Sequence, residues 1–153
     1  MIELSRIDWG AYECRCGEGG HVGEDMRRII SARSLAEMGV ATLEGHVEDQ
    51  AMVAPVAAPA AGVIMAAFQE DLAPVVVEEL LLALWRLVLG EADESVTAEI
   101  HEQVRDGIWL IYREATRGDT ETALEILEYV ERDRARYEHV RQALAGRLAK
   151  RTR

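Results

Sequence analysis

The chain has few cysteines, prolines and phenylalanines. Its 153 residues include two Cys, three Pro and one Phe. The cysteines, Cys14 and Cys16, are too few for the disulfide framework that stabilises small secreted domains. Lysine is nearly absent, because Lys150 is the single lysine among 17 basic residues, and there is no asparagine. This bias is typical of a GC-rich genome and indicates no mechanism.

Basic residues are scarce relative to acidic ones. The chain carries 17 Lys and Arg against 28 Asp and Glu, which gives a net charge of -11 at pH 7. Phosphate backbones repel such a body, so we expect no nucleic-acid partner. A basic protein partner is electrostatically allowed, because opposite charge accelerates encounter. Solubility alone also accounts for an acidic surface.

No apolar run is long enough to span a bilayer. The longest, residues 80–89, is interrupted by Arg86, whereas a transmembrane helix needs roughly 20 apolar residues. The opening segment, MIELSRIDWGAY, lacks the positive start and apolar stretch of a secretory signal. We therefore expect no membrane partner and a cytoplasmic location.

What the sequence does contain is helical periodicity, from Val22 nearly to the C-terminus. Pro59 and Pro74 suit the first turn of a helix, where a missing N–H costs nothing. Gly90 is a stop signal after the second of these helices. The expected helices cover residues 23–31, 34–48, 58–70, 74–89, 93–117, 120–133 and 135–150, with 93–117 the longest.

These elements predict an all-α fold built from antiparallel helix pairs. Such pairs stack into a short HEAT-like superhelix when they recur at intervals near 40 residues. A closed helical bundle gives a similar pattern, and periodicity does not separate the two. We expect one domain over residues 1–153, with an irregular N-terminal segment at 1–21 and a basic C-terminal tail at 147–153.

The segment DQAMVAPVAAPAAGVIMAAF, residues 49–68, carries a family resemblance. It resembles a segment of uncharacterised HEAT-like repeat proteins of actinobacteria, which reads roughly His-Gln-Gly before an Ala-Pro-rich entry into an apolar helix. Gln50 and Pro59 fall at the matching positions. Asp49 and Ala51 replace the usual His and Gly, so any role of that His is absent here.

The N-terminal Trp9 and Tyr12, followed by a glycine-rich turn and a helix, also fit that family's pattern. The resemblance covers residues 8–90. It implies an α-α superhelix and supplies no catalytic residues.

The stretch ECRCGEGGHV, residues 13–22, holds three metal-ligand side chains: Cys14, Cys16 and His21. A structural zinc site takes four ligands, with cysteines usually two to four residues apart. Cys-x-Cys is tighter than that, and the fourth ligand would be His46 or a carboxylate. The alternative is a loop with a buried small side chain and a turn. Cysteines this close also predict poor disulfide geometry.

A second candidate surface lies on the expected long helix. Aromatic and arginine side chains there have the composition of a protein-binding hot spot. A solvated helix face is the alternative interpretation. The candidate partner-binding residues are His101, Arg105, Trp109, Tyr112 and Arg113.

Familiar catalytic patterns are missing from the sequence. The stretch GEGGHVGED lacks the Lys-Ser/Thr ending of a phosphate loop, and no His-Glu-x-x-His motif occurs. We therefore predict a non-catalytic protein-interaction module, for example an acidic immunity or inhibitor protein that binds a basic partner. One alternative is a zinc-binding protein or metal-dependent enzyme that uses the Cys-x-Cys loop. Another is the structural subunit of a homo-oligomer.

Overall fold

The computed structural model describes the backbone of residues 1–151 and the side chains of residues 1–146. Within that range the chain is mostly helical, which confirms the all-α prediction. A single 3₁₀ turn, η1, covers Trp9–Ala11 in the described part. The α-helices are α1 (Ile2–Arg6), α2 (Gly20–Ser31), α3 (Leu35–Met38), α4 (Ala57–Ala67), α5 (Pro74–Leu89), α6 (Glu94–Asp106), α7 (Ile108–Arg117), α8 (Thr120–Val130) and α9 (Arg134–Arg151).

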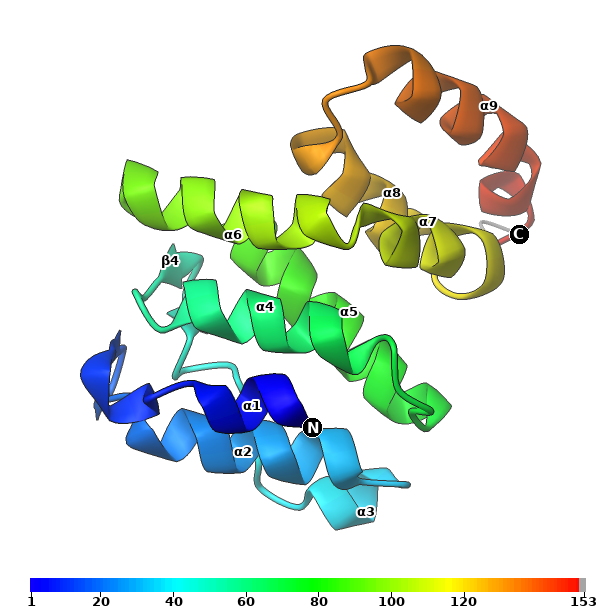
Figure 1. Cartoon of the computed structure of the whole chain (residues 1–153). Coiled ribbons are helices and arrows are strands. Elements are labelled where there is room, and N and C mark those ends of the chain that lie inside the picture. The colour runs from blue at the N-terminus through cyan, green and yellow to red at the C-terminus, as the bar shows by residue number, and fades with distance from the viewer. Residues whose placement is uncertain (152–153) are drawn as a thin grey trace.

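Figure 1 shows these helices in three groups, with α1 to α3 at one end, α4 to α6 in the middle and α7 to α9 at the other end. Helix α4 packs mainly on α6, and α5 packs on α8. The core is continuous through all three groups. These contacts are compatible with a HEAT-like superhelix and with a closed bundle, so both arrangements stay predictions.

Helix α5 has the bounds that its sequence predicts. Pro74 occupies its first turn, and Gly90 follows its last residue in an extended conformation. Val76, Leu80 and Leu84 are fully buried along it. A helix that is apolar on most sides is stable only inside a core, so α5 forms the centre onto which α8 packs.

Helix α4 is buried along nearly its whole length because its side chains are small. Ala57, Ala60 and Ala61 expose none of their surface. A Cβ on Gly62 would approach Gln103 Oε1 of α6 to 2.7 Å. Small residues at these positions therefore let α4 and α6 approach closely.

Two short antiparallel hairpins lie in the N-terminal half. Their sequences carry no long alternating pattern, and the periodicity did not predict them. The strands are β1 (Glu13–Cys14) paired with β2 (Gly17–Glu18), and β3 (Glu48–Asp49) paired with β4 (Met52–Val53).

The second hairpin turns through two residues that are not glycine. Gln50 has φ of 50° and Ala51 has φ of 67°. Positive φ at both central residues is the geometry that a two-residue hairpin turn prefers, and it favours Gly or Asn. Ala51 has a Cβ and yet adopts this left-handed conformation, so the turn carries backbone strain.

The predicted helix over 34–48 is wrong for most of its length. Helix α3 ends at Met38, and the chain then turns through Gly39 and Gly45, whose φ angles are 64° and 79°. Those left-handed conformations are available to glycine without strain. Apolar side chains of this stretch instead anchor a loop, since Leu43 and Val47 are both buried.

The predicted long helix over 93–117 is two helices. Gly107 separates α6 from α7, with φ of −118° and ψ of 24°. A Cβ at Gly107 would lie 2.8 Å from Met65 Cε of α4. The break therefore coincides with a place where the chain passes close to the core, and the longest helix of the described residues is α9.

The N-terminal segment is less irregular than the sequence predicts, because it contains α1, η1 and the first hairpin. The basic tail at 147–153 lies outside the residues whose side chains are described. Among the described residues, no helix combines the length and the apolar character needed to cross a membrane.

Candidate metal centre

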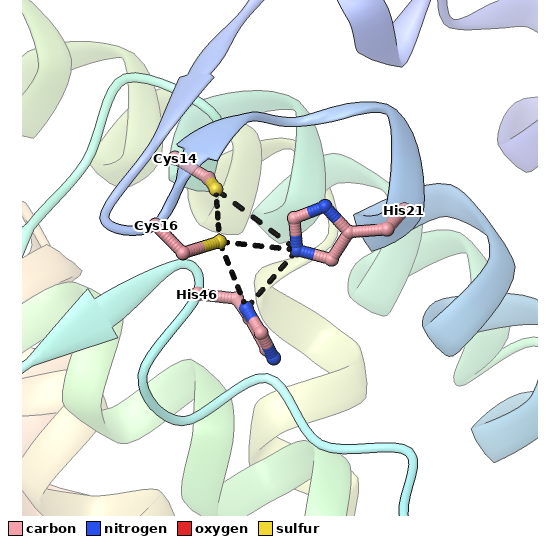
Figure 2. Close-up of side chains that lie close together, drawn as sticks. All are labelled: Cys14, Cys16, His21 and His46. Atoms are coloured by element: carbon pink, nitrogen blue, oxygen red, sulfur yellow. Dashed lines mark hydrogen bonds between the residues drawn. The ribbon is translucent and has the colours of Figure 1, made fainter.

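Four metal-ligand side chains converge at the first hairpin. Figure 2 shows Cys14, Cys16, His21 and His46 pointing toward a common point. One ligand atom from each lies within 4.8 Å of the other three. The structure thus brings together the three residues predicted from the Cys-x-Cys loop, and of the two predicted sources of a fourth ligand it places His46 there.

The two cysteines are positioned by the hairpin turn. Cys14 lies in β1 opposite Gly17, and the turn between them contains Cys16. Gly17 has φ of 127°, a conformation that L side chains rarely adopt. The turn places Cys14 Sγ 2.7 Å from Cys16 Sγ. Neither cysteine forms a disulfide; Cys14 is buried and Cys16 is exposed.

The two histidines occur in the same short motif. Gly-His-Val occurs at residues 20–22 and again at 45–47. Val22 is fully buried and Val47 is 1% exposed, so each histidine is followed by a side chain anchored in the core. This repeated tripeptide is the signal that would have selected His46 from the sequence.

Both histidine rings face the Cys16 sulfur and each other, and the His21 ring also faces the Cys14 sulfur. His21 Nε2 lies 3.9 Å from Cys14 Sγ and 3.4 Å from Cys16 Sγ. His46 Nδ1 lies 3.2 Å from Cys16 Sγ and 3.0 Å from His21 Nε2. The two rings meet edge to face, with centroids 4.6 Å apart.

Main-chain hydrogen bonds fasten the same segments together. The Arg15 N–H donates to the His46 carbonyl oxygen at 2.9 Å. The Val56 N–H donates to the Glu13 carbonyl oxygen at 3.2 Å. The first bond holds the hairpin against the loop that carries His46, and the second holds it against the residue that precedes α4.

This set of atoms fits a tetrahedral metal ion. Zinc bonds of about 2.3 Å to sulfur and 2.0–2.1 Å to nitrogen place neighbouring ligand atoms roughly 3.3–3.8 Å apart. Three sulfur–nitrogen distances and the nitrogen–nitrogen distance, 3.0–3.9 Å, are close to that range, and all four ligand atoms lie within 4.8 Å of one another. The two sulfurs would separate by about 1 Å to admit the ion.

In the metal-free arrangement the surroundings of Cys16 favour its thiol over its thiolate. The hydrogen bond with Cys14, followed by burial, raises the pKa of Cys16 above its ordinary value. A bound cation has the opposite effect, because it favours the thiolate. Metal binding at this centre would therefore release protons.

The predicted partner-binding residues lie elsewhere, on α6 and α7, and most of them make internal contacts. The His101 ring nitrogen Nε2 lies 3.1 Å from the Val88 carbonyl oxygen. Arg105 donates to the Val130 carbonyl oxygen, and Arg113 donates to that of Phe68. These side chains join helices rather than standing free on a surface.

The aromatic members of that set differ in exposure. Trp109 is 64% exposed, whereas Tyr112 is 6% exposed. Their rings lie 5.4 Å apart, and the Arg136 guanidinium of α9 lies 4.9 Å from the centre of the Trp109 ring. Of the five predicted residues, Trp109 alone is an exposed anchor.

Tyr112 belongs to a buried polar network at the base of α9. Its hydroxyl donates to Glu131 Oε2 at 2.8 Å, and Arg136 donates to both oxygens of the same carboxylate at 2.8 Å. These Arg136 bonds lower the pKa of Glu131 to about 2. Burial, and then the Glu131 carboxylate, raise the pKa of Tyr112 to about 12. The network joins α7 to the start of α9.

Comparison of the chain with protein-family models, with curated proteins and with solved structures found no match. The resemblance to HEAT-like repeat proteins therefore stays a prediction, and the function rests on the site itself.

Proposed function

We propose that this chain is a zinc-binding helical protein whose metal centre is formed by Cys14, Cys16, His21 and His46. The observation that carries the proposal is the convergence of these four ligand atoms within 4.8 Å. They come from three separate parts of the chain: the first hairpin, the start of α2 and the loop before β3. Two thiolates and two imidazoles are a ligand set that suits zinc.

The role that this set supports is structural. Four protein ligands complete a tetrahedron and leave no open position for water or substrate, which a catalytic zinc needs. The ion would fasten the hairpin and the His46 loop, two segments whose own secondary structure is minimal. Short strands and loops of this kind have little regular hydrogen bonding to hold them, so a metal cross-link contributes directly to their stability.

The competing interpretation is a metal-free loop in which thiols and imidazoles satisfy one another by hydrogen bonding. It explains why the atoms are close. It does not explain why two Gly-His-Val segments present both rings to the same cysteine sulfur, that of Cys16.

Metal analysis of the untagged protein, purified without chelator and reloaded with zinc, tests the proposal. We expect one zinc per chain, and loss of that zinc in a Cys14→Ser/Cys16→Ser double variant. His139→Ala, which changes an exposed histidine on α9, is the matched control and should keep the zinc. A wild-type chain that stays metal-free after reloading would overturn the proposal.

Protein interaction is a second candidate function, favoured by the exposure of Trp109 on an acidic body. A large aromatic anchor with an arginine beside it is typical of a hot spot. Binding to an immobilised basic polypeptide, measured at low and raised salt, provides the test. Trp109→Ala should weaken retention at least several-fold, whereas Tyr129→Ala, an exposed aromatic on α8, should not. Equal retention of all three proteins would remove this candidate.

A further inference from the structure

Cys14 and Cys16 are placed to react with each other as well as to bind a metal. Their sulfurs are 2.7 Å apart, roughly 0.7 Å longer than a disulfide bond. The one-residue spacing predicts poor disulfide geometry, but the hairpin turn brings both sulfurs to the same side. Joining them requires a small movement of two side chains.

The two sulfurs differ in their access to solvent. Cys16 is exposed and Cys14 is buried. A small oxidant in solution therefore meets Cys16 first, while Cys14 is held behind it within bonding reach. An accessible thiolate beside a second cysteine is the arrangement of oxidation-sensitive sites.

We propose that the Cys14–Cys16 pair is an oxidation site, at which a peroxide converts the two metal-bound thiolates into a disulfide and releases the ion. This inference rests on the proposed zinc centre. Its consequence is that His21 and His46 remain as two neutral ligands, too few to hold zinc in this geometry. Oxidation would then remove the metal cross-link between the first hairpin and the loop that carries His46.

The chemistry balances with peroxide as the oxidant. The Cys16 thiolate attacks one peroxide oxygen, the O–O bond breaks, and the leaving hydroxide takes a proton to become water. The Cys14 thiolate then attacks the sulfur of the resulting sulfenic acid. The S–S bond forms, the S–O bond breaks, and the second hydroxide also becomes water. Two thiolates lose two electrons, and the peroxide gains them.

Hydrogen peroxide added to the zinc-loaded full chain tests the inference. A zinc indicator dye should report one zinc released per chain, and intact mass should fall by the two hydrogens of a disulfide relative to the reduced metal-free chain. A thiol reductant with added zinc should restore the loaded protein. Retention of zinc under peroxide, or release with added oxygen but no disulfide, would overturn the inference.

A Cys16→His variant gives the matched control. It keeps four metal ligands but has a single thiol, so it should load zinc and release at least several-fold less at the peroxide dose that empties the wild type. Equal release from both proteins would show that the disulfide is not the cause. A wild type that never loads zinc would overturn the proposed function first, and this inference with it.

Discussion

His21 Nε2 and His46 Nδ1 lie 3.0 Å apart although 25 residues separate them in the chain. Each histidine is followed by a buried valine, and both rings face the Cys16 sulfur. The proposed zinc ion would lie between these two nitrogens, and several consequences of that proposal can be measured.

Replacing His46 with alanine should abolish tight zinc binding, because three ligands remain. Zinc at 100 times its Kd adds about 2.7 kcal/mol to the stability of a protein that binds it only when folded. For a chain of this size that is a rise of roughly 5–10 °C in Tm. We expect this rise in the wild type and in His139→Ala, and none in His46→Ala. Thermal unfolding with and without zinc makes the comparison, and a zinc-dependent rise in His46→Ala would contradict the assignment of the fourth ligand.

Gly23→Ala should destabilise the N-terminal group of helices. A Cβ at Gly23 would lie 2.4–2.8 Å from atoms of the buried Trp9 ring, so the indole must shift. Overpacking of this kind costs about 1–3 kcal/mol. Gly20→Ala is the control on the same helix, since a Cβ there meets nothing within 4 Å. Urea unfolding should rank Gly23→Ala clearly below Gly20→Ala, and equal stabilities would contradict this packing.

Glu131→Gln should lower stability at neutral pH by roughly 2 kcal/mol, because it removes the charge from a buried, hydrogen-bonded pair. The pKa of Glu131 is lowered from 4.5 to about 2 by Arg136. A lowered carboxyl pKa stabilises the folded state above the ordinary pKa, and that contribution disappears as pH falls from about 4.5 toward 2. The wild type should therefore lose its advantage over Glu131→Gln across that interval.

Glu138→Gln tests whether a carboxylate with a lowered pKa must be buried to stabilise the folded state. Glu138 also has its pKa lowered to about 2, chiefly by Arg141, but this ion pair lies on the surface, where solvent screens it. Denaturant unfolding between pH 2 and 7 should show little difference between Glu138→Gln and the wild type. A loss as large as that of Glu131→Gln would show that burial does not set the effect.

Ala51→Gly should stabilise the protein by about 0.5 kcal/mol, because relief of a left-handed alanine outweighs the added chain entropy. Ala66→Gly is the matched substitution in a right-handed setting, within α4, and should destabilise by about 1 kcal/mol. Opposite shifts in the urea midpoint are the expected result. Destabilisation by both changes would mean that the turn at Ala51 is not strained.

The sequence predicts most helices well because their signals are local. Pro74 and Gly90 bracket α5 at the observed residues. The errors arise where glycine conformation depends on the rest of the fold. Gly39 and Gly45 adopt positive φ and end a predicted helix, and Gly107 breaks another beside Met65.

The candidate metal centre was predictable in part, because some of its residues are also close in sequence. Cys14, Cys16 and His21 lie within eight residues of each other, so their proximity follows from the chain itself. The choice of His46 over a carboxylate depends on a loop that docks from 25 residues away. Periodicity does not report that docking. The predicted interaction face stays a prediction, and Arg105, Arg113 and Tyr112 also make hydrogen bonds inside the fold that helical periodicity does not report.

The stacking of Arg136 on Trp109 also has an optical consequence. The indole is 64% exposed, yet a guanidinium from the first turn of α9 covers one of its faces. Any motion that lifts α9 from α7 would strip that cover and change the fluorescence of the indole. The fluorescence of Trp109 would therefore report whether α9 stays packed against α7. These helices lie at the opposite end of the molecule from the first hairpin, which carries the cysteines (Figure 1).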